Sequence, residues 1–174
     1  MRYPRTMAWS LVLSFILSLA VVALADTATD ARKAMKAVQV AYNRIDIAAN
    51  AKNVKGFLAY NAPDYAIVDK NDVVRMRSDA NMAAGYSAFF AASLVYKQQT
   101  TIQKLTLHDS EAVVTVKQHI ERTASDPTTK QRVRSVMNGV LEETWIQNAK
   151  GWQRIRTTAL EMHATENGKT INAR

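Results

Sequence analysis

The sequence predicts an α+β domain in which three N-terminal helices pack on a curved antiparallel sheet and enclose a cone-shaped pocket. Two observations support this prediction. Between residues 28 and 98, apolar residues recur at three- and four-residue steps, which is typical of helices with one buried face. From residue 100 onward, four long β-type runs are separated by short polar turns, as in neighbouring antiparallel hairpins. Helices that precede such strands cover one face of the sheet, and a curled sheet leaves a cavity between the two.

The first 25 residues are predicted to be a signal peptide that precedes the domain. Arg2 and Arg5 come before an uncharged run, residues 7–25, that ends in an A-x-A triplet. A basic start, an apolar run and a small-residue end are typical of a secretory signal. We expect cleavage after Ala25, a secreted or periplasmic product and no membrane contact afterwards. The alternative is an uncleaved anchor, because the apolar run approaches the roughly 20 residues of a spanning helix.

The net charge and the amino-acid composition indicate which kinds of ligand or partner the protein can bind. The chain of 174 residues has a formal charge of +8, and loss of Arg2 and Arg5 would leave +6, which favours anionic ligands or surfaces. The basic residues are scattered, and the densest group, residues 130–134, is typical of a solvated strand start. We therefore expect no nucleic-acid partner. The absence of cysteine excludes disulfides, thiol nucleophiles and thiolate metal sites.

The helical elements follow in order along the chain. The first helix is predicted over residues 28–51, capped by Thr29 or Asp30, and its buried face comprises Ala34, Val38, Ala41, Ile45 and Ala48. A short helix over 53–61, capped by Asn53, ends before Pro63. The third helix, over 78–98, is capped by Ser78 and anchored by Met82, Phe89 and Phe90.

The strands surround and follow the third helix. Residues 64–69 form a first strand and residues 70–76 a turn with a short return strand. The four long runs are residues 100–109, 111–124, 132–147 and 151–165. We therefore place a single domain at residues 26–165, followed by a polar, frayed tail at 166–174.

Two stretches carry a resemblance to a known family. "YNRIDIAANAKNVKGFLAYNAPDYAIVDKN" (42–71) is similar to the helix, short helix and strand of SnoaL-like and ketosteroid-isomerase-like proteins. "LEETWIQNAKGWQRI" (141–155) is similar to their strand, turn and tryptophan-bearing strand. The chain thus resembles the nuclear-transport-factor-two-like superfamily, which has a cystatin-like fold, over most of residues 32–162. The resemblance is specific for the fold and not for an activity, because the family includes enzymes and non-catalytic binding domains.

The resemblance implies roles for individual residues. Ketosteroid isomerases use a carboxylate base, with a tyrosine and a protonated acid that hold the enolate oxygen. Ungapped superposition of the motifs places the base at Asp69 and the protonated acid at Glu143. The tyrosine position falls on Ile45, which departs from the pattern, although Tyr42 lies one turn earlier on the same helix face. Tyr60, Tyr65, Phe89 and Trp145 are expected to line the pocket.

The residues themselves leave two of these assignments open. Asp69 precedes a polar turn, where aspartate is common for purely local reasons. Glu143 shares strand parity with the apolar Leu141 and Trp145, which favours an inward carboxyl, but Glu142 also shares parity with apolar residues. His108, His119 and His163 lack metal-ligand spacing, so we expect neither a metal nor another cofactor.

Three functions fit these observations. The first is an exported domain that binds a small apolar or amphipathic ligand in the cone without chemistry. The second is an isomerase, cyclase or dehydratase with Asp69 as base and Glu143 as oxyanion donor, assisted by Tyr42. In the third, side chains close the pocket and the open sheet face makes a homodimer, so that the role lies in association. A homodimer is compatible with all three.

Overall fold

The computed structural model describes the backbone of residues 8–171 and the side chains of residues 29–171. It contains three helices, α1 (Ala8–Asn50), α2 (Val54–Leu58) and α3 (Ala80–Ala91), within this range. The strands there are β1 (Asn61–Val68), β2 (Val74–Arg77), β3 (Ser93–His108), β4 (Glu111–Ser125), β5 (Arg132–Asn148), β6 (Gly151–Glu166) and β7 (Lys169–Ile171). The α+β class and the three helices are confirmed.

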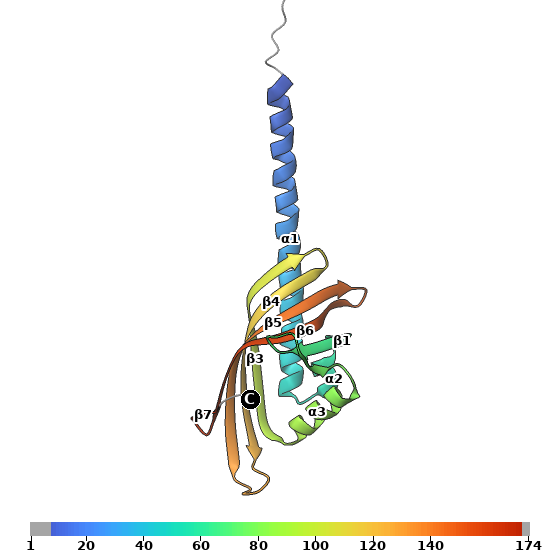
Figure 1. The fold of residues 1–174 in the computed structure, drawn as a ribbon. Helices are drawn as coiled ribbons and strands as arrows, with labels where there is room; N and C mark the ends of the chain where they lie inside the picture. Colours follow the sequence, from blue (N-terminus) through green and yellow to red (C-terminus); the bar gives the residue numbers. More distant parts are fainter. Residues whose placement is uncertain (1–7, 172–174) are drawn as a thin grey trace, which may run out of the picture.

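All the strands belong to one curved sheet. Its order is β2-β1-β6-β5-β4-β3, with β7 paired to β6 (Figure 1). Every pairing is antiparallel except that of β1 with β6, which is parallel. The chain therefore inserts its first strand beside its last long one, and residues about 90 positions apart in sequence become neighbours, such as Asn61 and Arg154.

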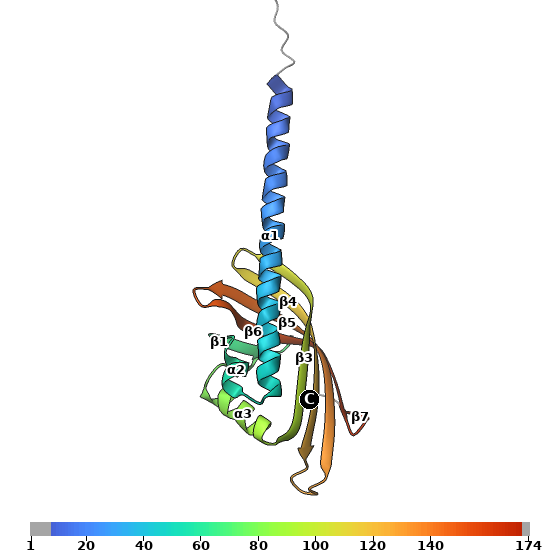
Figure 2. The ribbon, with the colours of Figure 1, turned by 180° about the vertical axis from the view of Figure 1, so that it is seen from behind.

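The helix α1 crosses the concave face of this sheet (Figure 2). All five residues of its predicted buried face are buried, with exposures from 0% for Val38 to 8% for Ala48. They pack in one cluster with Val114, Val116 and Trp145, which are all fully buried on the strands. Burial of this apolar stripe holds the helix against the sheet.

Several predicted boundaries are wrong. The helix α1 runs through residues 28–30 without a break, because no glycine or proline interrupts the chain there. The helix α3 is capped by Asp79, not Ser78, since the Asp79 side chain accepts a hydrogen bond from the amide of Met82. It ends at Ala91, and the segment that was assigned to its last turns is instead the start of β3, paired to β4. Tertiary pairing overrides helical propensity here.

The remaining differences are smaller. The helix α2 is capped by Asn53 as predicted but is only five residues long, and β1 begins at Asn61 rather than at residue 64. Pro63 is accommodated because the β1–β6 register is interrupted between Asn61 and Ala66. Part of the predicted tail forms β7.

Two side chains of α1 cover the open edge of the sheet at β3. The Asp46 carboxylate accepts hydrogen bonds from Gln98 Nε2 (2.9 Å), from the Thr100 amide (2.7 Å) and from Thr100 Oγ1 (2.9 Å). One turn later, the Asn50 side chain bonds both the amide (2.6 Å) and the carbonyl (3.1 Å) of Gln98. Asp46 and Asn50 thus hold the edge strand β3 against α1.

The predicted signal peptide, residues 1–25, involves side chains outside the described part of the chain and stays a prediction. In the part whose side chains are described, no helix is both long enough and apolar enough to cross a membrane.

Candidate functional site

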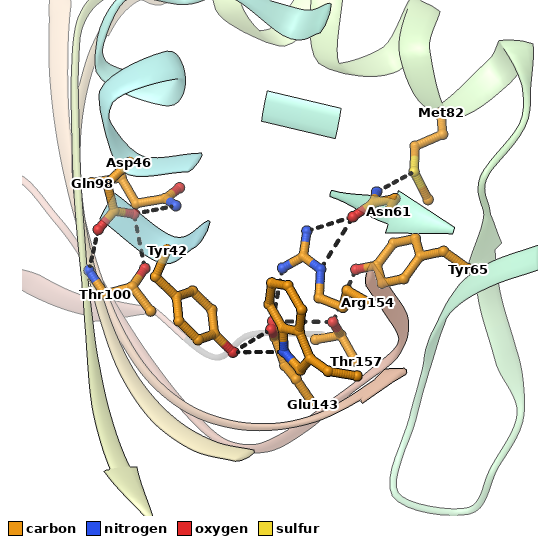
Figure 3. A network of polar contacts seen from close by, with 11 residues as sticks. Tyr42, Asp46, Asn61, Tyr65, Met82, Gln98, Thr100, Glu143, Arg154 and Thr157 are labelled. Carbon is orange, nitrogen blue, oxygen red and sulfur yellow. Dashed lines mark hydrogen bonds and ion pairs between the residues drawn. The ribbon is translucent and has the colours of Figure 1, made fainter. Parts of the chain in front are cut away.

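A buried polar network lies between α1 and the strands β1, β5 and β6 (Figure 3). At its centre is the Glu143 carboxylate, which is 1% exposed. It accepts hydrogen bonds from Tyr42 Oη (2.6 Å), Arg154 Nη1 (2.9 Å) and Thr157 Oγ1 (3.1 Å). Strand alternation explains the position: Glu143 pairs with Val114 in register and points to the same face as Leu141 and Trp145, while Glu142 is exposed.

Arg154 is the cation that compensates this carboxylate. Its guanidinium also donates from Nε (3.1 Å) and Nη2 (2.8 Å) to Asn61 Oδ1, and its Cζ lies 4.9 Å from the centre of the Tyr65 ring. Burial by itself lowers the pKa of Arg154, but the charge of Glu143 outweighs this and raises the pKa above its ordinary value. The pair is therefore a charge-assisted hydrogen bond between two buried ions.

The two phenols beside the ion pair are held neutral. Burial, followed by the nearby charge of Glu143, raises the pKa of Tyr42 well above its ordinary value. Burial likewise raises the pKa of Tyr65 to about 12. Tyr42 therefore donates to Glu143, accepts from Trp145 Nε1 (3.1 Å), and meets the Trp145 ring edge-on. Tyr65 Oη donates to Thr157 Oγ1 (2.9 Å), which extends the chain of donors to Glu143.

The centre of the network is closed to solvent. Tyr42, Glu143 and Trp145 are each at most 1% exposed, so no space as large as a water molecule adjoins them. Among the described residues, no buried side-chain nitrogen or oxygen lacks a hydrogen-bond partner. The network thus has the properties of a fully satisfied structural core rather than of a polar group that awaits a ligand.

The sequence-predicted site residues are brought together only in part. The Tyr42 hydroxyl and the Glu143 carboxyl do contact each other, as the isomerase-type hypothesis requires. Their surroundings differ from what the resemblance implied, because Tyr42, Arg154 and Thr157 all donate to the Glu143 carboxyl oxygens and leave none of them facing a substrate. Sequence reasoning missed Arg154 and Asn61. The only signal was that Arg154 shares strand parity with the apolar Trp152.

Asp69 lies beyond the end of β1, in the turn to β2. Its carboxylate accepts hydrogen bonds from the amides of Asn71 (2.8 Å) and Val73 (3.0 Å), and from Arg75 Nη2 (2.6 Å). The amide of Asn71, followed by that of Val73 and the Arg75 guanidinium, lowers the pKa of Asp69. A base for a carbon acid needs the opposite shift. The observed contacts are those of the turn residue that the sequence also allowed.

The other expected pocket residues are spread over the domain. Trp145 and Tyr65 belong to the buried network, whereas Phe89 is 36% exposed and carries the Arg122 guanidinium 4.5 Å above its ring. Tyr60 is half-buried at the start of β1 and accepts a hydrogen bond from Arg44. No group of three or more metal-ligating His, Asp or Glu side chains occurs among the described residues.

Two surface depressions flank the closed network. We name the first the α1 groove; it has a volume of 750 Å³ and lies between α1 and the turns β3–β4 and β5–β6. The second, which we name the outer-face groove, has a volume of 410 Å³ and lies on the sheet face remote from α1. Both volumes are in the range of small-molecule sites.

Two cross-strand rows of side chains line the outer-face groove. One row is Thr101, Lys117, Val140 and Glu161, and the other is Gln99, His119, Asn138 and His163. His119 lies between Asn138 Oδ1 (2.7 Å) and Glu121 Oε1 (3.3 Å). The contact with Asn138, followed by that with Glu121, raises the pKa of His119. His119 therefore lies on the sheet face remote from α1.

Comparison with known proteins identifies the fold. No protein-family model and no curated protein matches the chain. A solved candidate scytalone dehydratase from Novosphingobium aromaticivorans aligns with a TM-score of 0.65 at 13% identity, over 84% of this chain and 93% of that one. An NTF-2-like protein of unknown function from Shewanella oneidensis aligns with a TM-score of 0.57 at 15% identity, over 72% and 97%.

A protein of unknown function with a cystatin-like fold, from Nostoc punctiforme, aligns with a TM-score of 0.53 at 11% identity, over 72% of this chain and 88% of that one. The chain therefore has the NTF-2-like, cystatin-like fold that its sequence predicted. Sequence identities this low establish the fold and leave the activity to the site. A domain of this fold is compatible with ligand binding.

Proposed function

We propose that this protein is an exported, non-catalytic domain that binds a small molecule at its surface. The observation that carries the proposal is the closed interior: Glu143 is 1% exposed, and protein groups occupy its carboxylate. Export rests on the predicted leader of residues 1–25. The solved neighbours, of which one is a candidate dehydratase and others have no known function, support a ligand-binding domain without specifying the ligand.

Catalysis of the isomerase type would need a base and an oxyanion donor that face one open space. Asp69 is held ionised by its turn, with a lowered pKa. Glu143 is paired to Arg154 and has no adjoining space for a substrate. Neither residue has the surroundings that its catalytic role requires, which favours binding over chemistry.

Enzyme assays on matched variants test this proposal. We expect the purified protein, Glu143→Gln and Asp69→Asn to leave the rate of proton exchange next to the carbonyl of enolisable ketones at the buffer level. Glu143→Gln is expected to lower the midpoint of thermal unfolding, because it leaves the Arg154 charge buried without its counterion. Exposed Glu142→Gln is the matched control and should leave that midpoint unchanged.

The outcome that would contradict the proposal is equally definite. Wild-type protein would accelerate exchange well above buffer, Glu142→Gln would retain that rate, and both Glu143→Gln and Asp69→Asn would abolish it while folded. Such a result would require that the interior opens in solution, and it would restore the isomerase-type mechanism.

A second role, self-association through the outer face, is favoured by one observation. Lys117 on β4 and Glu161 on β6 lie in the same cross-strand row, two strands apart, and neither makes an ion pair. If two copies stack face to face about a two-fold axis along β5, β4 of each copy faces β6 of the other. Lys117 of one copy then faces Glu161 of the other, so the surface is complementary to itself.

Sedimentation velocity on charge variants tests this homodimer. We expect the wild type to form a dimer and Lys117→Glu to weaken it by about tenfold or more, because attraction becomes repulsion at two places. The double variant Lys117→Glu/Glu161→Lys should recover the dimer, while Lys36→Glu on the exposed side of α1 should not affect it. A wild type that stays monomeric at all concentrations would exclude this role.

A further inference from the structure

The α1 groove exists because one face of α1 carries small side chains. Ala34, Ala37 and Ala41 are spaced three and four residues apart and line the groove together. Across from them, Leu107 and Trp152 line it from the sheet side, and Trp152 is 9% exposed. The alanines leave a volume of 750 Å³ that larger side chains would fill. Its lining is mixed, with the alanines, Leu107 and Trp152 beside charged and polar side chains.

The rim of the groove has more positive than negative charge. Its lining includes Lys33, Arg44 and Lys150 against Asp30 and Asp109. Asp30 and Lys33 neutralise each other in a 3.1 Å ion pair. Among the residues whose side chains are described, Arg44 and Lys150 have no carboxylate partner and Asp109 has no cationic partner, which leaves the rim with one net positive charge; Arg44 donates to Tyr60 Oη (3.3 Å).

This combination distinguishes the groove from the other depression. Apolar surface on the floor accommodates a hydrocarbon or aromatic body, and unpaired cations at the rim accommodate an anionic head. The outer-face groove, in contrast, has no alanine, leucine, tyrosine or tryptophan in its lining. The two unpaired cations come from separate elements, α1 and the β5–β6 turn, so an anion between them would bridge the helix to the sheet.

The groove is separate from the interior that the resemblance singled out. Tyr60 directly precedes β1, whereas Asp69 directly follows its other end. The buried network around Glu143 contributes no residue to the lining. A ligand in the α1 groove therefore needs no opening of the cone.

We propose that the α1 groove binds an amphipathic monoanion, namely a small soluble carboxylate with a short apolar body. Arg44 and Lys150 hold the carboxylate, and Tyr60 and Trp152 contact the body. This inference rests on the proposed function, for which it names the site and the class of ligand. It does not depend on the homodimer, because no residue of the groove belongs to the outer face.

A pair of probes that differ only in charge tests the proposal. Octanoate and octan-1-ol are titrated into the ¹⁵N-labelled protein, and the indole N–H signals of Trp152 and Trp145 are followed by NMR. We expect octanoate to bind at least about tenfold more tightly than octanol, because only the carboxylate can pair with the rim cations. The Trp152 signal should shift strongly and that of fully buried Trp145 little.

Matched variants locate the anion. Arg44→Gln and Lys150→Gln are each expected to weaken octanoate binding by about fivefold, the size of one exposed ion pair, and to leave octanol binding unchanged. Arg32→Gln is the control, since Arg32 lies on the same helix outside the groove, and its effect should stay within about twofold. Each variant's spectrum without ligand reports whether it is folded.

Three results would overturn the inference. Equal affinity for octanoate and octanol would remove the role of the cations. An equal loss of octanoate affinity in Arg32→Gln and Arg44→Gln would mean that the overall positive charge of the protein, and not the rim of the groove, attracts the anion. Sedimentation with phosphatidylglycerol vesicles but no binding of free octanoate would place the anion in a membrane surface. All three leave the non-catalytic role intact, because that role is tested by the exchange assay on Glu143 and Asp69 variants.

Discussion

Replacement of Arg154 by methionine is expected to lower the free energy of unfolding by about 3–5 kcal/mol, because it leaves the Glu143 charge buried without a counterion. Glu143 is 1% exposed and Arg154 is 6% exposed, so water cannot take the place of the guanidinium. The substitution also removes both donors to Asn61 Oδ1. Denaturant unfolding of the wild type and the variant, followed by fluorescence, measures the loss.

Two further variants show that the loss comes from the uncompensated charge. The double variant Glu143→Leu/Arg154→Met replaces both ions by apolar groups and should recover most of the stability. Arg156→Met, two residues further on the same strand, breaks an exposed pair with Asp72 and should lose at most about 1 kcal/mol. If Arg154→Met lost no more than Arg156→Met, the buried ion pair would have no structural role.

Replacement of Asp46 by alanine is expected to lower the free energy of unfolding by about 3 kcal/mol, because buried donors lose their only acceptor. The carboxylate accepts three hydrogen bonds from Gln98 and Thr100, which are 5% and 6% exposed. These bonds join α1 to β3, the open edge strand of the sheet. The loss of stability should therefore be accompanied by detachment of β3 from α1.

Amide hydrogen exchange and denaturant unfolding together measure this effect. The Thr100 amide should exchange much faster in Asp46→Ala. Amides in the centre of β5 should exchange faster only to the extent that the global free energy of unfolding falls. Asp64→Ala is the control, because Asp64 is exposed and its carboxylate forms no ion pair among the described residues. Unchanged protection of Thr100 would mean that β3 is held by its pairing to β4 alone.

Local sequence patterns predicted which face of each helix or strand is buried. The three- and four-residue spacing in α1 identified five residues of its buried face, and all five are buried. Tyr42 and Ala49 are buried as well but were not assigned to that face. Strand parity favoured an inward Glu143, although it left Glu142 as an equal candidate for the inward position. The NTF-2-like fold followed from the order of these elements.

Boundaries at α3 and β3 were less predictable for a specific reason. Residues 92–98 suit a helix by local sequence, but their backbone groups pair with β4 across a long antiparallel ladder. Local propensity contributes a few tenths of a kcal/mol per residue, and a ladder with a buried face outweighs it. The cap at Asp79 rather than Ser78 is a difference of one position between two good capping residues.

Only the tertiary structure decided what surrounds each candidate site residue. Sequence analysis predicted that Glu143 could be buried, but its ion-pair partner is Arg154, which reaches it because β6 lies between β5 and β1. The same sheet order gives Arg154 its second partner, Asn61. The contacts of Asp69 with Arg75 and the turn amides likewise show that it is a turn residue, which the sequence alone left open. The periodicity of apolar residues is a local property of the sequence, and it indicates which side chains are buried. The partner of a buried charge depends instead on which distant segments of the chain the fold brings together.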